Sequence, residues 1–235
     1  LELRDIVVMA PDIQDYAALI PAVFHDLQHS IADRSLRRQN DVLATFLHFL
    51  DLLGGRFGWM EILDLLQQQA IAARFELTAG DLDNLRQWVT AAGIRWGLSA
   101  GHRREIGLPA DPEGTWRAGL DRLLMGYAID APDLVDGILP YGDIEGGGAR
   151  ALGGRCEFVA ILDEAEHELR RSHDLDQWSG ILRHFADRLF GEGDDDDSLE
   201  LRQILSELHG GDFHRSPVAL AVIRAWLDTA AAETR

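Results

Sequence analysis

The sequence of 235 residues is long enough for one large domain or two small ones, and 46% of the residues are hydrophobic, which suffices for a packed core. The formal net charge is −18, so the average surface repels a polyanion such as DNA, and any nucleic-acid contact needs a local cationic patch. All 22 basic residues are arginine. The absence of lysine excludes a phosphate-loop lysine, a Schiff-base lysine and nuclease sites that need a lysine beside their carboxylates.

The remaining composition predicts a soluble chain of the cytoplasm. Cys156 is the single cysteine, so no internal disulfide forms. No apolar run reaches the roughly 18 residues of a membrane span. Charged residues interrupt the N-terminal segment, which therefore does not resemble a signal peptide. Because the first residue is Leu1, we expect a processed protein or a piece of a longer one.

The N-terminal segment carries the only α/β character. Residues 5–9 form a short apolar run that predicts a buried strand, and Pro11 with Asp12 opens a helix to about Phe24. Ile31 and Ala32 indicate a second short strand.

From Asn40 onward the hydrophobic spacing is helical. Gly54 ends the first of these helices, and Thr78 and Thr115 are the expected N-caps of two later ones. Prolines and glycines in 131–150 predict a linker, and Ser216 with Pro217 predicts the start of the last helix. The apolar stripes that define the helices cover residues 43–53, 59–66, 82–89, 116–127, 152–169, 175–189 and 201–208.

Two catalytic patterns are present but incomplete. Gly97–Gly101 matches G-x-S-x-G, yet the nucleophile serine of that motif follows a strand, whereas a helix precedes it here. His167 and His173 are six residues apart, about 120° around a helix, so they cannot converge on one metal ion. The acidic run 194–197 lacks the glycine and glutamate of a calcium loop. We therefore expect Gly97–Gly101 to form a loop, the segment around His167 to be the solvated face of a helix, and residues 194–197 to form a solvated turn.

Several stretches, taken in order, resemble the exodeoxyribonuclease V gamma-chain (RecC) family. Most of them lie within residues 4–141, and the rest of the chain matches only in helical character. The stretches are Arg4–Met9, Pro11–Ile13 with Tyr16, Ile31–Ser35, Leu85–Val89, Gly93–Gly97, Thr115–Arg117, Gly119–Leu120, Arg122–Leu124, Gly126–Tyr127 and Ile138–Tyr141.

This resemblance implies a mainly α fold, a helical accessory domain with a small α/β remnant of a RecA-like domain at the N-terminus. Residues 1–38 would be a partial RecA-like segment, 39–130 a helical lobe, 131–150 the linker and 151–235 a second helical lobe. The family architecture is that of a UvrD-like superfamily I helicase without ATPase motifs. The chain would be a non-catalytic scaffold that channels DNA in the RecBCD helicase–nuclease during double-strand break repair and recombination.

The resemblance also implies partners, namely RecB-like and RecD-like motor subunits and DNA, with no membrane contact. We expect no cofactor, metal or catalytic residue in the chain, and weak or no DNA binding by the chain alone. The arginine clusters, among them Arg103 with Arg104, are expected to pair mainly with carboxylates.

The predicted contact residues for DNA or a partner are Arg95 and Trp96, in the loop after Gly93, and Trp116 and Arg117 at a helix start. Two other functions remain open: the accessory domain of an active UvrD- or RecB-type helicase, and a metal-dependent hydrolase that uses Asp163, Glu164 and His167.

Overall fold

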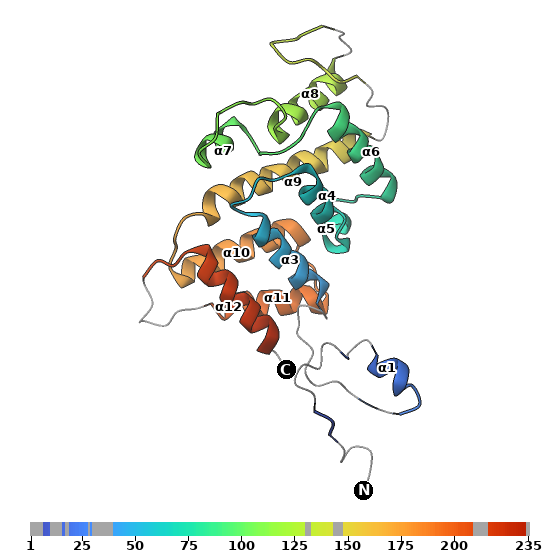
Figure 1. The fold of residues 1–235 in the computed structure, drawn as a ribbon, viewed down its shortest axis with the longest axis vertical. Coiled ribbons are helices and arrows are strands. Elements are labelled where there is room, and N and C mark those ends of the chain that lie inside the picture. The colour runs from blue at the N-terminus through green and yellow to red at the C-terminus, as the bar shows by residue number, and fades with distance from the viewer. Residues whose placement is uncertain are drawn as a thin grey trace.

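The computed structural model describes residues 7–9, 16, 19–27, 29, 40–129, 133–142, 148–208 and 216–233. These residues form helices and contain no sheet, which confirms the predicted mainly α fold (Figure 1). The helices are α1 (Ile20–Val23), α3 (Asp41–Leu52), α4 (Trp59–Leu66), α5 (Gln69–Arg74), α6 (Ala79–Ala91), α7 (Ala100–Glu105), α8 (Trp116–Ala128), α9 (Gly148–Leu169), α10 (Leu175–Phe190), α11 (Asp196–Ser206) and α12 (Leu220–Glu233).

The α/β remnant predicted for the N-terminus is not seen in the part of the chain that the structure describes. Val7, Val8 and Met9 of the predicted strand 5–9 have no regular structure, and their side chains are 75–89% exposed. Helix α1 lies within the helix predicted from Asp12 to Phe24. The predicted strand at residues 31–32 lies outside the described residues.

The helix ends predicted at Thr78, Thr115, Gly54 and Gly93 are confirmed by the local geometry. The Thr78 hydroxyl accepts a hydrogen bond from the Asp81 N–H, and the Asp81 carboxylate accepts one from the Thr78 N–H in return. Thr115 caps α8 as Thr78 caps α6, because its hydroxyl oxygen accepts a hydrogen bond from the Ala118 N–H. Gly54 and Gly93 follow α3 and α6 with φ of 75°, a left-handed conformation that a side chain disfavours.

The helix pattern differs from the prediction at several positions. Helix α11 begins at Asp196, inside the acidic run 194–197 that was predicted to be a turn, and α9 begins at Gly148, inside the predicted linker. The last helix begins at Leu220 instead of at Ser216, because the Val218 backbone N–H and C=O are both engaged in an antiparallel bridge with His173. The short helices α5 and α7 were not predicted, since each is only 6 residues long and shows less than two turns of hydrophobic spacing.

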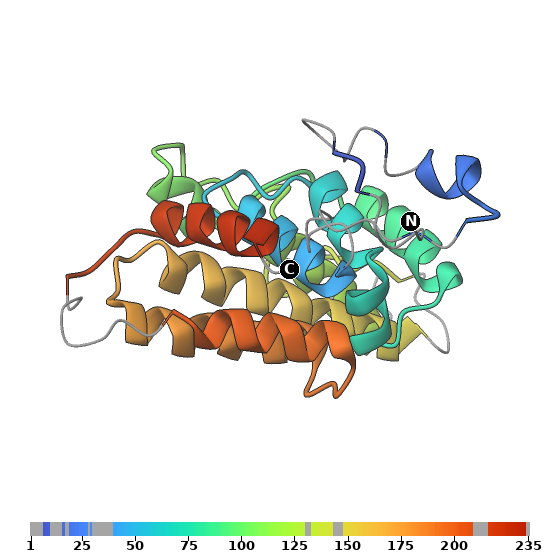
Figure 2. The ribbon, with the colours of Figure 1, turned by 90° about the horizontal axis from the view of Figure 1, so that it is seen from below.

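The core is one hydrophobic cluster with side chains from both predicted lobes, 39–130 and 151–235. Helix α3 packs against α4, α5, α11 and α12, and α9 packs against α8 and α10, which lies beside it in Figure 2. An aromatic group joins α3 to α10, with ring centroids 6.2 Å apart for Phe49 and Phe185 and 6.3 Å apart for Phe46 and Phe190. The predicted boundary between the lobes stays a prediction.

Part of the predicted linker is a β-turn that packs on α8. Val135 and Ile138 form an antiparallel bridge around Asp136 and Gly137, whose φ angles are 49° and 80°. We call residues 133–142 the hairpin. Among the described residues, no helix combines the length and the apolar character needed to cross a membrane.

Candidate functional site

The loop at residues 94–98 is fixed on both sides by backbone hydrogen bonds. One neighbouring segment is 56–59, which is far from the loop in sequence. The other is 114–117, which is separated from the loop by α7. The bonds run from Arg95 N to Gly114 O (2.9 Å), Trp59 N to Arg95 O (3.1 Å), Gly97 N to Arg56 O (2.8 Å) and Trp116 N to Gly97 O (2.9 Å). Such a loop presents its side chains from a rigid frame.

Arg103 of α7 holds this loop from within. Its side chain is 6% exposed, and Nη1 donates to the carbonyl oxygens of Asp111 and Glu113, both at 2.8 Å. Nη2 donates to the Trp96 carbonyl oxygen at 2.9 Å, and the guanidinium lies 4.1 Å from the centroid of the Trp96 ring. A buried cation is thus stabilised by backbone dipoles and an aromatic face, without a carboxylate.

Exposed arginines gather around the same loop. The Arg56 guanidinium lies 5.7 Å from the Trp96 ring centroid, and the exposed Arg95 directly precedes Trp96 in the loop. Within the described residues, neither arginine forms an ion pair with a carboxylate, whereas arginines on other helices do, among them Arg74, Arg86, Arg188, Arg202 and Arg224. We call Arg56, Arg95 and Trp96 the arginine–tryptophan surface.

The structure divides the four predicted contact residues. Arg95 and Trp96 lie together on the arginine–tryptophan surface. Arg117 is 77% exposed, and its Nε lies 3.5 Å from Oδ1 of Asp121. Trp116 is 1% exposed, so its ring belongs to the core and is not displayed to a partner.

Arg56 was not predicted as a contact residue, because the only feature near it in the sequence is the pair of glycines that ends α3. Nothing in that segment indicates that it lies beside the loop around residue 96. Arg103 was noted only as part of an arginine pair, with carboxylates as its expected partners. The structure instead gives it three carbonyl oxygens.

The G-x-S-x-G pattern is a helix start. Ser99 is the N-cap of α7, and its hydroxyl oxygen accepts a hydrogen bond from the His102 N–H at 3.2 Å. The residues before it form the loop described above and no strand. The serine therefore has a structural partner in place of a catalytic base.

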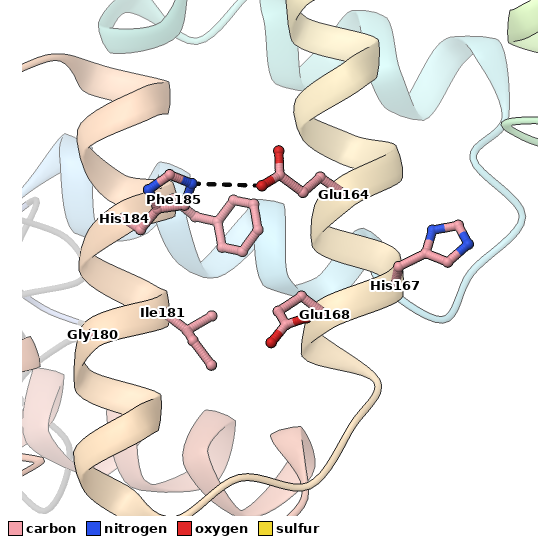
Figure 3. Close-up of a pocket in the computed structure, with 7 residues that line it drawn as sticks. All are labelled: Glu164, His167, Glu168, Gly180, Ile181, His184 and Phe185. Atoms are coloured by element: carbon pink, nitrogen blue, oxygen red, sulfur yellow. Dashed lines mark ion pairs between the residues drawn. The ribbon is translucent and has the colours of Figure 1, made fainter.

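A surface groove of about 350 Å³ lies between α9 and α10. Figure 3 shows that Glu164 faces α10, where it pairs with His184 at 3.7 Å and with Arg188, while the His167 ring is directed away from α10. His167 Nδ1 instead lies 2.7 Å from the Asp163 carbonyl oxygen. The described residues contain no group of three or more His, Cys, Asp or Glu side chains that could hold a metal ion. The groove is lined by Glu164, His167, Glu168, Gly180, Ile181, His184 and Phe185.

A buried acid and a buried histidine lie where α7, α9 and the end of α3 meet. Glu166 is fully buried, accepts hydrogen bonds from the Gly54 N–H at 2.7 Å and from Arg170 at 3.1 Å, and lies 3.9 Å from Nε2 of His102. Burial raises the pKa of Glu166 and lowers the pKa of His102. Both shifts favour the neutral form of the group, while the hydrogen bond from Arg170 favours the Glu166 carboxylate.

The shifted pKa of His102 predicts a loss of stability in mild acid. Because the folded-state pKa lies below the ordinary value of 6.5, the folded chain binds fewer protons than the unfolded chain as the pH falls through 6.5. Stability is then complete above pH 6.5 and declines below it, by at most about 1.4 kcal/mol per pH unit for one proton. Urea unfolding between neutral and mildly acidic pH measures this slope.

A substitution at His102 distinguishes its contribution to this pH dependence from that of the carboxylates. His102→Gln is expected to remove this decline, since glutamine does not titrate. His184→Gln, at a histidine whose side chain is 54% exposed, is the control and should retain the wild-type slope. An unchanged slope in His102→Gln would show that other groups cause the decline.

The sequence comparisons identify the family. Residues 39–235 match the family described as RecBCD enzyme subunit RecC fourth domain. The chain is 37% identical over 194 residues to the RecBCD enzyme subunit RecC of Escherichia coli (strain K12), which covers 80% of this chain and 17% of that protein. It is 33% identical over 253 aligned positions to the RecC subunit of Mycolicibacterium smegmatis, which covers 97% of this chain and 23% of that protein.

The relative from Haemophilus influenzae, also named RecBCD enzyme subunit RecC, is 27% identical over 97% of this chain. The chain spans about a fifth of the length of these curated relatives. The chain belongs to the RecC family and carries the region described as the fourth domain of that subunit.

Proposed function

We propose that this chain is a non-catalytic scaffold that helps to channel DNA in a RecBCD-type helicase–nuclease acting in double-strand break repair and homologous recombination. Membership of the RecC family supports the assembly, since the relatives are named as subunits of the RecBCD enzyme.

The observation that carries the DNA contact is the arginine–tryptophan surface. In this chain of net charge −18, Arg56 and Arg95 are exposed and form no ion pair with a carboxylate among the described residues, which is also true of Arg104 and Arg183. Arg56 is distinguished by the Trp96 ring, whose centroid lies 5.7 Å from its guanidinium and which the buried Arg103 keeps in place. Guanidinium groups beside an aromatic face bind phosphates and stack with unpaired bases.

The partners in this proposal are RecB-like and RecD-like motor subunits together with DNA, in the cytoplasm. The chain itself supplies no cofactor site in the proposal, and the motors supply ATP hydrolysis. The surface of Arg117 is retained as a second, smaller contact, because its side chain is largely exposed and only loosely paired.

Neither alternative function gains support. The accessory domain of an active helicase would match motor proteins, whereas the relatives described above are RecC subunits. The hydrolase alternative needs Asp163, Glu164 and His167 to converge, but Glu164 is paired with basic side chains of α10 and His167 points away from it (Figure 3).

The DNA contact is tested by charge removal in the intact protein assembled with its motor subunits. Arg56→Ala with Arg95→Ala is expected to weaken binding of a fluorescein-labelled oligothymidylate about tenfold. The dependence of log K on log salt should become shallower by about 0.7 for each phosphate that the variant no longer neutralises. Fluorescence anisotropy over a salt series measures both quantities.

The matched control is Arg183→Ala, which removes an exposed arginine from α10, outside the arginine–tryptophan surface. It should leave the affinity and the salt slope at wild-type values. Equal affinities for the double variant and the control would contradict a role of this surface in DNA binding.

A further inference from the structure

One end of the fold displays apolar side chains that a separate domain would be expected to cover. In the hairpin, Leu134 is 67% exposed and Leu139 is 46% exposed. On the last turn of α8 and just beyond it, Leu124, Tyr127 and Ile129 are 42–53% exposed. Figure 1 shows the hairpin beyond the end of α8, at one extreme of the long axis. Exposed leucines are ordinary when isolated, but a group of them at one end indicates a contact surface.

The hairpin is held in a fixed position, which a docking element needs. The Tyr141 N–H donates to the Arg122 carbonyl oxygen at 3.1 Å, and Arg122 Nε donates to the Leu139 carbonyl oxygen at 3.0 Å. The backbone of Tyr141 approaches α8 so closely at Gly126 that a Cβ there would overlap it. The apolar side chains are therefore presented without a large cost in ordering when a partner binds.

The charges at this end select the kind of partner. Asp133 and Asp136 are exposed in the hairpin and form no ion pair within the part of the chain that the structure describes. Arg122, the arginine that contacts the hairpin, is turned inward to carbonyl oxygens. Nucleic acid would be repelled here, whereas a protein surface with an apolar centre and a rim of lysine or arginine is complementary.

The hairpin lies toward the opposite end of the long axis in Figure 1 from the start of α3 and the end of α12. Neither of these two segments therefore covers its apolar side chains.

We propose that the hairpin and the end of α8 form a docking surface for another subunit, which contributes an apolar patch bordered by basic side chains. This inference rests on the proposed membership in a multi-subunit assembly, but the docking surface shares no residue with the arginine–tryptophan surface.

The test uses the intact protein and the purified motor subunits of the proposed assembly. Leu134→Asp is expected to weaken subunit binding at least about tenfold, because it places a desolvated carboxylate at an apolar contact. Gly126→Ala keeps every apolar side chain but displaces the hairpin, and it should weaken binding in the same way. Leu199→Asp is the control, since Leu199 of α11 is also 49% exposed but lies outside the surface. Biolayer interferometry gives the dissociation constants.

A photo-crosslinking residue in place of Leu134 makes the test independent of folding. A crosslink from position 134 to a motor subunit, together with wild-type affinity for Leu199→Asp, supports the docking surface. Crosslinks only within the same polypeptide, or Leu134→Asp affinity equal to wild type, overturn it. If the wild-type protein fails to bind the motor subunits at all, the proposed assembly itself is wrong, and this result is distinct from the other two.

Discussion

Alanine at position 103 is expected to lower the free energy of unfolding by about 3–5 kcal/mol, because three buried carbonyl oxygens lose a charged donor. Each such bond contributes about 1.5–3 kcal/mol alone, and the three are not additive. Arg103→Lys should recover only part of this loss, since an ammonium group is too compact to reach Trp96, Asp111 and Glu113 together. Urea unfolding monitored by circular dichroism gives the difference.

Arg104→Ala is the matched control, one residue along α7 and exposed. It should change the free energy of unfolding by no more than about 0.5 kcal/mol. If Arg103→Ala were equally mild, the buried guanidinium would not be needed to hold the loop, and the backbone hydrogen bonds alone would account for its rigid frame.

The sequence predicted the helices well because their signals are local. Thr78 and Thr115 are N-caps that bond to N–H groups three residues on, so the pattern alone places those helix starts. The start at Ser216 was wrong for the opposite reason. Its backbone neighbour Val218 pairs with His173, more than forty residues away, and no local pattern encodes such a contact.

The site could be predicted only in part for the same physical reason. Arg95 and Trp96 stand out because an aromatic and a cation follow a helix-ending glycine. The contribution of Arg56 depends on a hydrogen bond from the Gly97 N–H to its carbonyl oxygen, across a gap of some forty residues. Which of two adjacent arginines is buried, Arg103 or Arg104, is likewise decided by the segments that fold over α7.

Trp116, predicted to contact DNA or a partner, has the position that most clearly indicates a structural role instead. Its ring is 1% exposed, and Nε1 donates to the Phe57 carbonyl oxygen at 3.0 Å within the core. Trp116→Ala is therefore expected to lower the free energy of unfolding by about 3–5 kcal/mol, through the reduced burial and the cavity left behind. Trp116→Phe keeps most of the ring but removes the donor to Phe57, and should cost about 1–3 kcal/mol.

Trp96→Ala is the comparison that decides between the roles, because Trp96 is only partly buried. Trp96→Ala should lower the free energy of unfolding less than Trp116→Ala does. It should weaken binding of the oligothymidylate by the assembled protein more, since removing the aromatic partner of a stacked base costs about 1–3 kcal/mol of binding free energy. Chemical denaturation and anisotropy on the same two variants measure both effects. The reverse order, with Trp116→Ala leaving stability intact and abolishing binding, would place the contact at the start of α8 and require that tryptophan to leave the core.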